Sequence, residues 1–172
     1  MKRFNIYKKI GACTIYLLLF MGCSDGDITI QSISFNDIGI ESCTQTTNTT
    51  LLFKINDKES IALQLPTGLL KNSVSEQTIQ SAIPNQASLE YRVFSESISA
   101  SYYCSILPEI GVSVIRNAEA TAGNVLINTS LSEDGESFNH EIQLSGVSFT
   151  DQDGKRITDV NLNNFGIFTT PK

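Results

Sequence analysis

The sequence predicts an all-β fold: an antiparallel β-sandwich with about eight or nine strands and one short helix. Three observations predict it: apolar and polar residues alternate with a period of two after Asp27, turn residues separate these stretches, and no strand–helix–strand pattern recurs. A lipocalin-like barrel is the alternative, and the absence of Trp counts against it. The length of 172 residues suits one domain, assigned to residues 28–172.

Two hairpins are the clearest elements. In residues 51–65, apolar odd-numbered positions from Leu51 to Ile55 place their side chains on one face, a polar turn follows at 56–59, and the alternation resumes at Ile61. The second hairpin joins residues 125–131 to 138–144 through a turn that contains Asp-Gly.

Other stretches are predicted from weaker patterns. Changes of phase between Ile30 and Ile33 and across Ser145–Gly146 indicate β-bulges. The one helix is expected at residues 74–83, where Ser73 and Glu76 have capping-box spacing and a proline follows. The remaining strands are expected at residues 28–35, 89–93, 102–106, 112–114 and 160–167.

The N-terminus has the pattern of a secretory signal peptide. Four basic residues precede a mostly apolar run over residues 10–22. The end of this run, Leu19–Cys23, resembles the lipobox of bacterial lipoproteins, with Phe20 where Leu is usual. The resemblance implies that residues 1–22 are removed and that Cys23 becomes the lipidated N-terminus, carrying fatty-acyl groups such as palmitate. An ordinary signal peptide cut nearby and an uncleaved anchor are the alternatives.

Residues 23–27 form the expected acylated tether. Ser24–Asp27 resembles the acidic surface-export tag behind the lipidated cysteine of Bacteroidetes-type lipoproteins, and a plain polar spacer is the other interpretation. Either one implies an outer-membrane protein, lipid-anchored and either periplasmic or surface-exposed.

The cysteines predict one disulfide. Cys13 leaves with the signal peptide and Cys23 carries lipid, so Cys43 and Cys104 remain as a pair in an oxidising compartment. A zinc site would need more nitrogen or sulfur ligands, and only His140 is left to supply one. We therefore expect a disulfide, with no metal and no cofactor.

The segment before the second cysteine carries a further resemblance. Residues 100–104, Ala-Ser-Tyr-Tyr-Cys, resemble the segment that precedes the second cysteine of immunoglobulin variable domains. No Trp lies between Cys43 and Cys104, so the resemblance implies a sandwich that is immunoglobulin-like in general architecture, and not membership of that family. It also implies that Tyr102 forms a corner hydrogen bond.

Charge and the single histidine exclude several classes. With 18 acidic and 12 basic residues, a net charge of −6 argues against binding to nucleic acid. His140 is in phase with Phe138 and Ile142, so it is expected in the core with a satisfied ring nitrogen and not in a Ser-His-Asp site. No catalytic residue is assigned.

Four other features are candidate sites. The acids of residues 133–136 are expected to be solvated turn residues, and Asp151–Gly154 begins like a calcium loop but lacks the later Glu, because Val160 stands there. The polar stretch Thr44–Thr50 is either a connection or a glycan contact. Tyr102 and Tyr103 are expected on opposite faces of a strand, where an exposed Tyr103 would stack on a ligand ring.

Three functions remain as hypotheses. The leading one is a non-catalytic binding or accessory subunit, held on the membrane by its lipid, for an outer-membrane protein or a surface polymer. The second is a carbohydrate-binding module, calcium-assisted, acting through residues 44–50 and 151–153. The third is a small hydrolase acting through acidic residues. Nucleic acid is not an expected partner.

Overall fold

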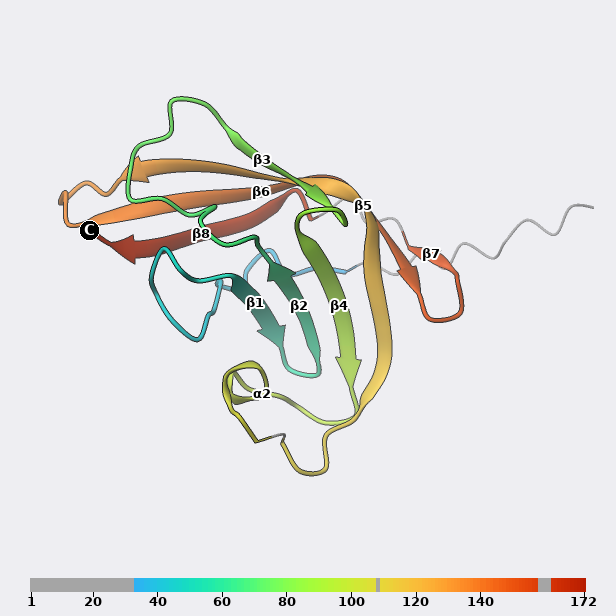
Figure 1. Cartoon of the computed structure of the whole chain (residues 1–172). Coiled ribbons are helices and arrows are strands. Elements are labelled where there is room, and N and C mark those ends of the chain that lie inside the picture. The colour runs from blue at the N-terminus through green and yellow to red at the C-terminus, as the bar shows by residue number, and fades with distance from the viewer. Residues whose placement is uncertain (1–32, 108, 158–161) are drawn as a thin grey trace, which may run out of the picture.

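The computed structural model describes residues 33–107, 109–157 and 162–172 (Figure 1). The expected signal peptide, the acylated tether and Cys23 lie outside these residues. Within them are eight strands and one four-residue helix, α2 (Ser101–Cys104). The strands are β1 (Leu51–Asn56), β2 (Glu59–Gln64), β3 (Ile79–Ile83), β4 (Ser88–Phe94), β5 (Val114–Leu131), β6 (Ser137–Asp151), β7 (Arg156–Ile157) and β8 (Asn164–Pro171).

All the strands belong to one antiparallel sheet. Its main order is β1-β2-β4-β5-β6-β7, with β3 paired to β5 and β8 paired to β6. The first half of β5 pairs with β4 and the second half with β3, while β6 follows β5 along both halves. The all-β class is therefore confirmed. The described residues also contain one short helix, but not at residues 74–83, where one was expected.

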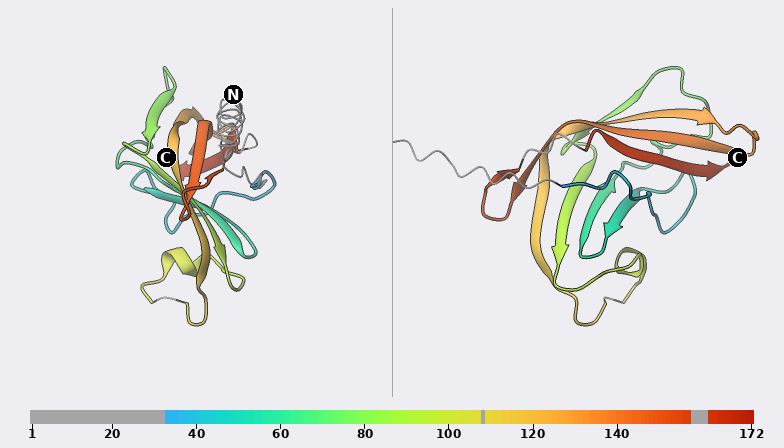
Figure 2. Two further views of the ribbon diagram at one scale, coloured as in Figure 1. Left: turned by 90° about the vertical axis from the view of Figure 1, so that its right-hand side faces the viewer. Right: turned by 180° about the vertical axis from the view of Figure 1, so that it is seen from behind.

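The sheet folds onto itself along β5 and β6. Figures 1 and 2 show β1, β2 and β4 in one layer, and β3, β6, β8 and the far half of β5 in the other. The buried apolar cluster draws side chains from both layers, so the core lies between them. The architecture is thus one curled sheet whose two ends enclose the core, in place of the two separate sheets of the expected sandwich.

An irregular register marks the bend. The β5–β6 pairing shifts on both sides of Ala122, opposite the segment from Ser145 to Ser148, as expected from the phase change at Gly146. Gly123 lies here with φ 137°, and a Cβ atom would come within 3.0 Å of Val147 Cγ2. Only glycine fits this position, because both the backbone angle and the close approach exclude a side chain.

Residues 33–41 lie between the two edge strands β1 and β8. Glu41 exchanges backbone hydrogen bonds with Phe53 on β1, and Ile40 packs 3.3 Å from where a Cβ on Gly166 of β8 would stand. The expected strand at 28–35 is wrong in its described part, because residues 33–35 are irregular, although Ile33 and Phe35 are buried.

Lys54 is buried beside this segment, with 3% of its surface exposed. Its Nζ donates to the Phe35 carbonyl oxygen at 3.0 Å and lies 5.4 Å from the centre of the Phe165 ring. Burial lowers the pKa of its amine. The same carbonyl also accepts from the backbone amide of Ile38 at 3.2 Å, so Lys54 adds a second hydrogen bond to it. This contact gives the buried amine on the inner face of β1 a polar partner.

The face of β1 that packs in the core is not the expected one, which carried the odd-numbered residues. Leu52 and Lys54 point into the core between the layers, whereas Phe53 is fully buried outside that core cluster. Tyr103 of α2 stacks on the Phe53 ring and covers it. Both faces of β1 are therefore covered, so its alternation does not separate a buried face from an exposed one.

Two further predicted elements are wrong, the helix at residues 74–83 and the strand at residues 102–106. Residues 79–83, expected to be helical, form β3 and pair with β5, and the backbone amide of Ser75 already donates to the Thr129 carbonyl oxygen at 2.9 Å. This pairing supplies the hydrogen bonds that a local helix would otherwise provide. Residues 101–104, expected in a strand, form α2. Among the described residues, no helix is long and apolar enough to span a membrane.

Candidate functional site

The candidate site is the segment that joins β4 to β5, residues 95–113, here called the β4–β5 connection. It carries α2 and lies over the outer face of β1, β2 and β4, on the side away from β3, β6 and β8 (Figures 1 and 2). The rings of Tyr103 and Phe53 stack with centroids 4.6 Å apart and an interplanar angle of 26°. The Tyr103 and Ser60 hydroxyls are hydrogen-bonded at 2.6 Å. Phe53 is buried because the helix covers it.

Tyr102 packs beside Tyr103 and not on the opposite face. Its ring meets Phe94 edge-on at 4.7 Å and Tyr103 at 5.1 Å, and its hydroxyl accepts a hydrogen bond from Arg92 Nη1 at 3.4 Å. Arg92 also pairs with Glu90 at 2.7 Å. Consecutive side chains of a helix are about 100° apart, not on opposite faces as in a strand. Both rings therefore pack against the protein, and the expected exposed tyrosine is wrong.

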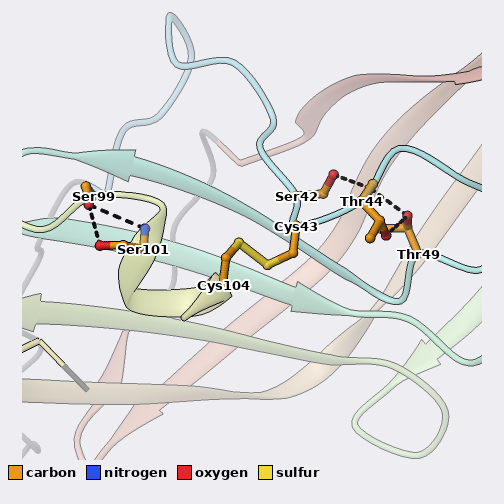
Figure 3. The surroundings of a disulfide bond; sticks show 7 residues. All are labelled: Ser42, Cys43, Thr44, Thr49, Ser99, Ser101 and Cys104. Atoms are coloured by element: carbon orange, nitrogen blue, oxygen red, sulfur yellow. Dashed lines mark hydrogen bonds between the residues drawn. A yellow bond between two sulfur atoms is a disulfide. The ribbon is translucent and has the colours of Figure 1, made fainter. Parts of the chain in front are cut away.

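The predicted disulfide is confirmed. Cys43 and Cys104 are joined, with an S–S distance of 2.04 Å and a Cα–Cα distance of 5.3 Å (Figure 3). Both cysteines lie at the surface. The bond ties the end of α2 to the segment that precedes β1, so the β4–β5 connection is covalently attached to the sheet it covers.

The neighbouring polar stretch Thr44–Thr50 is hydrogen-bonded to itself. Ser42 Oγ donates to the Thr44 carbonyl oxygen at 2.6 Å, and Thr49 Oγ1 donates to the same oxygen at 2.7 Å (Figure 3). Thr49 Oγ1 also accepts from the backbone amide of Thr46 at 3.2 Å. These hydroxyls shape a turn beside the disulfide.

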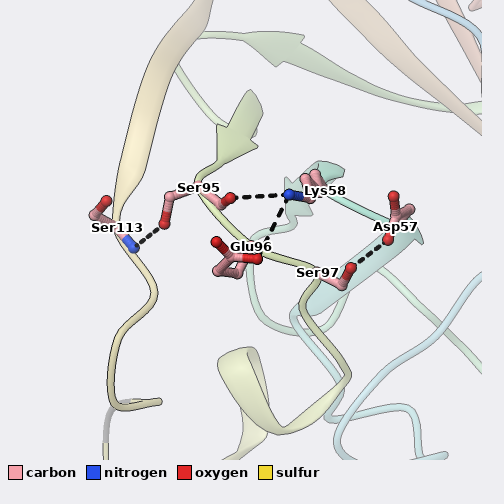
Figure 4. A network of polar contacts seen from close by, with 6 residues as sticks. All are labelled: Asp57, Lys58, Ser95, Glu96, Ser97 and Ser113. Carbon is pink, nitrogen blue, oxygen red and sulfur yellow. Dashed lines mark hydrogen bonds and ion pairs between the residues drawn. The ribbon is translucent and has the colours of Figure 1, made fainter.

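Polar contacts fasten the start and end of the connection (Figure 4). Lys58 Nζ, in the β1–β2 turn, donates to the Ser95 carbonyl oxygen at 3.0 Å and pairs with Glu96 at 3.5 Å. Ser97 Oγ donates to Asp57 Oδ1 in the same turn. The amide of Ser113 donates to Ser95 Oγ at 3.1 Å, closing the base of the connection.

The far end of the connection is apolar and exposed. Ile106, Leu107 and Ile110 have 100%, 79% and 101% of their surface exposed, and we call these three residues the apolar tip. Five of the eight exposed large apolar side chains in the described ranges lie between residues 106 and 115. Because such clustering is unusual on a protein surface, we take these residues as the candidate site of interaction.

Glu109 holds the tip against α2. Its Oε1 accepts a hydrogen bond from Ser99 Oγ at 3.2 Å and another from Ser101 Oγ. Glu96 is the other charged residue of the connection, which contains no Lys and no Arg. The site therefore combines exposed aliphatic side chains with negative charge on a fastened support.

No family model, curated protein or solved structure matches this chain, so its function has to be inferred from the geometry of its own residues.

His140 lies in the core, as its phase predicts. It has no exposed surface, and its Nδ1 and Nε2 lie 2.9 Å from the hydroxyls of Thr129 and Thr170. Thr170 Oγ1 donates to Asn72 Oδ1 at 2.9 Å, so it accepts from Nε2–H, and Nδ1 accepts from Thr129. Burial lowers the pKa of the imidazole, which keeps it neutral at pH 7.

This burial predicts a pH dependence of stability. The unfolded chain protonates His140 as the pH falls through about 6.5, whereas the folded protein, whose imidazole pKa is lowered by burial, protonates it only at a lower pH. The unfolded state then binds more protons, so the free energy of unfolding should fall as the pH drops from 7 towards 5. His140→Gln should lose about 1 kcal/mol at pH 7 and show a flatter profile. Urea unfolding across this range tests it, and equal slopes for the two proteins would contradict it.

The acidic candidates are turn residues. Asp134 Oδ1 accepts hydrogen bonds from Ser132 Oγ at 2.5 Å and from the amide of Glu136 at 3.0 Å, which lowers the pKa of Asp134 and does not raise it as a general acid needs. Asp151 Oδ1 accepts from the amides of Asp153 and Lys155 at 3.0 and 2.8 Å.

These two turns lie at opposite ends of β6 (Figure 1), so the sheet does not bring their carboxylates together. Within the three described ranges, no group of three His, Cys, Asp or Glu residues is placed to hold a metal ion. The residues that sequence reasoning missed are those of the apolar tip. Their signal is three aliphatic residues close together between Ser105 and Gly111. Ile106 instead falls in the expected strand at residues 102–106, and Leu107 and Ile110 have no place in the alternating pattern.

Proposed function

We propose that the chain is a non-catalytic binding or accessory subunit of a bacterial envelope, lipid-anchored through Cys23, that docks onto another envelope protein. One observation carries the proposal: a fastened segment presents fully exposed aliphatic side chains at the surface of a covered sheet. The exposed side chains of Ile106 and Ile110 do not stabilise the isolated fold, because aliphatic side chains contribute to stability when they are buried.

The way the connection is held supports a binding role. A disulfide, a ring stack and an ion pair between Lys58 and Glu96 all hold it against the sheet. A segment ordered before binding loses less conformational entropy when it docks. Two exposed cysteines joined in a disulfide also suit the oxidising envelope that the expected signal peptide implies.

Mass spectrometry tests the anchor. The protein extracted from its own membranes should have the mass of a chain that begins at Cys23 and carries two or three acyl groups, and Cys23→Ser should abolish acylation and release the protein from the membrane fraction. An unmodified chain that retains Lys2 would refute the anchor.

Retrieval from membranes tests the binding role. The lipidated protein, crosslinked in intact cells and purified in mild detergent, should retain one envelope protein in a fixed ratio. Protease added to intact cells tells whether the subunit faces outward. If the chain is recovered alone both with and without crosslinking, the binding role fails.

A further inference from the structure

We infer that the apolar tip is a docking surface for a partner protein that offers an aliphatic socket bordered by basic side chains. This inference rests on the proposed function and specifies where the partner binds and by what chemistry. The tip is Ile106, Leu107 and Ile110, on the β4–β5 connection.

The tip is presented in a fixed place. The disulfide ends at Cys104, two residues before Ile106, so a covalent bond to the sheet lies directly beside the tip. On the other side, Glu109 accepts hydrogen bonds from Ser99 and Ser101 of the α2 region, immediately before Ile110. Three aliphatic side chains held in water at known positions are the arrangement expected of anchors that fill a socket.

Charge indicates what surrounds the socket. The only charged side chains of the connection are Glu96 and Glu109. Glu109 stands between Leu107 and Ile110 in the sequence, so a partner that buries these two side chains also approaches its carboxylate. A basic border on the partner would complement it, whereas an acidic or apolar border would leave the carboxylate repelled or desolvated.

The same composition favours a protein over a lipid surface. Segments that insert into a membrane interface combine apolar residues with Lys or Arg, and with Trp at the headgroup level. The connection has neither, and its carboxylates would be repelled by anionic lipids.

A second copy of this chain is also disfavoured. Two copies that met through the tip would form an isologous contact, in which the same patch faces itself. That arrangement brings the two Glu109 carboxylates, and the acidic connections that carry them, close together without any basic residue of the connection to compensate.

Site-specific photocrosslinking in intact cells tests the inference. A photoreactive residue replaces Ile110 in the full lipidated protein, and the matched control carries it at Ile167, an aliphatic residue of β8 that is 61% exposed in the opposite layer. We expect position 110, and not position 167, to form an adduct with one envelope protein. The crosslinked peptide of that protein should contain aliphatic residues with Lys or Arg nearby.

Binding measurements with the identified partner then distinguish the aliphatic contact from the charge contact. Ile110→Ser should weaken binding at least tenfold, and Ile167→Ser should leave it unchanged. Glu109→Gln keeps an acceptor for Ser99 and Ser101 but removes the charge, so we expect a loss of about threefold and a weaker dependence on salt. Equal binding by wild type and Ile110→Ser would overturn the inference.

The other outcomes are distinct. Adducts with lipid would show that the tip inserts into a membrane, adducts of dimer mass would show a second copy, and equal adducts from both positions would show no specific surface; each overturns the inference. If the wild-type protein retains an envelope partner while position 110 forms no adduct, the inference fails and the proposed function stands. If no partner is retained at all, the proposed function fails as well.

Discussion

Replacing Cys43 and Cys104 together with serine should lower the free energy of unfolding by about 4 kcal/mol. The bond closes a loop with a sequence separation of 61 residues, and a crosslink of this span restricts the unfolded chain by about that amount in the loop-entropy model. Urea unfolding of the wild-type and double-serine proteins, followed by circular dichroism, measures the difference. The melting temperature should fall by several degrees or more.

The same substitution should act locally on the β4–β5 connection. Once α2 is no longer tied to the segment before β1, non-covalent contacts alone hold the connection, including the packing of the tyrosine rings and the polar contacts of Ser95, Ser97 and the two tyrosine hydroxyls. Limited proteolysis should then cut within residues 105–113 before the sheet is attacked. Reduction of the wild-type protein is the matched control and should give the same cleavage. Unchanged unfolding and unchanged cleavage in both would show that the bond does not stabilise the connection.

The parts of the fold that sequence predicted are those decided by local pattern. The hairpins at residues 51–65 and 125–144 combine alternation with turn residues, and both form as expected. The burial of His140 could be predicted because the alternation places its side chain on the same face as Phe138 and Ile142. The disulfide could be predicted from the oxidising compartment and from the assignment of the other two cysteines to the signal peptide and the lipid anchor.

The parts that could not be predicted depend on contacts distant in sequence. A four-residue helix is too short to be stable by itself, and α2 exists because Tyr103 stacks on Phe53, fifty positions away. β3 forms because its backbone pairs with the second half of β5, which is distant in sequence. The alternation in β1 cannot reveal its inner face when α2 covers the other one. One curled sheet, in place of two separate sheets, results from strands as long as β5 and β6 that bend at Gly123.

Tyr103→Ala should lower the free energy of unfolding by about 3 kcal/mol, because it removes the ring that covers Phe53 and leaves the Ser60 hydroxyl without its partner. Tyr103→Phe keeps the ring and loses only the hydrogen bond, so about 1 kcal/mol is expected. The pair thus separates packing from hydrogen bonding at one position. With the disulfide intact, Tyr103→Ala should also weaken binding by the apolar tip, since Cys104 alone does not fix the orientation of α2, whereas Tyr103→Phe should preserve binding. Urea unfolding and partner binding measured on both variants decide this. Equal losses of stability for the two would mean that the hydroxyl, and not the ring, holds the connection on the sheet.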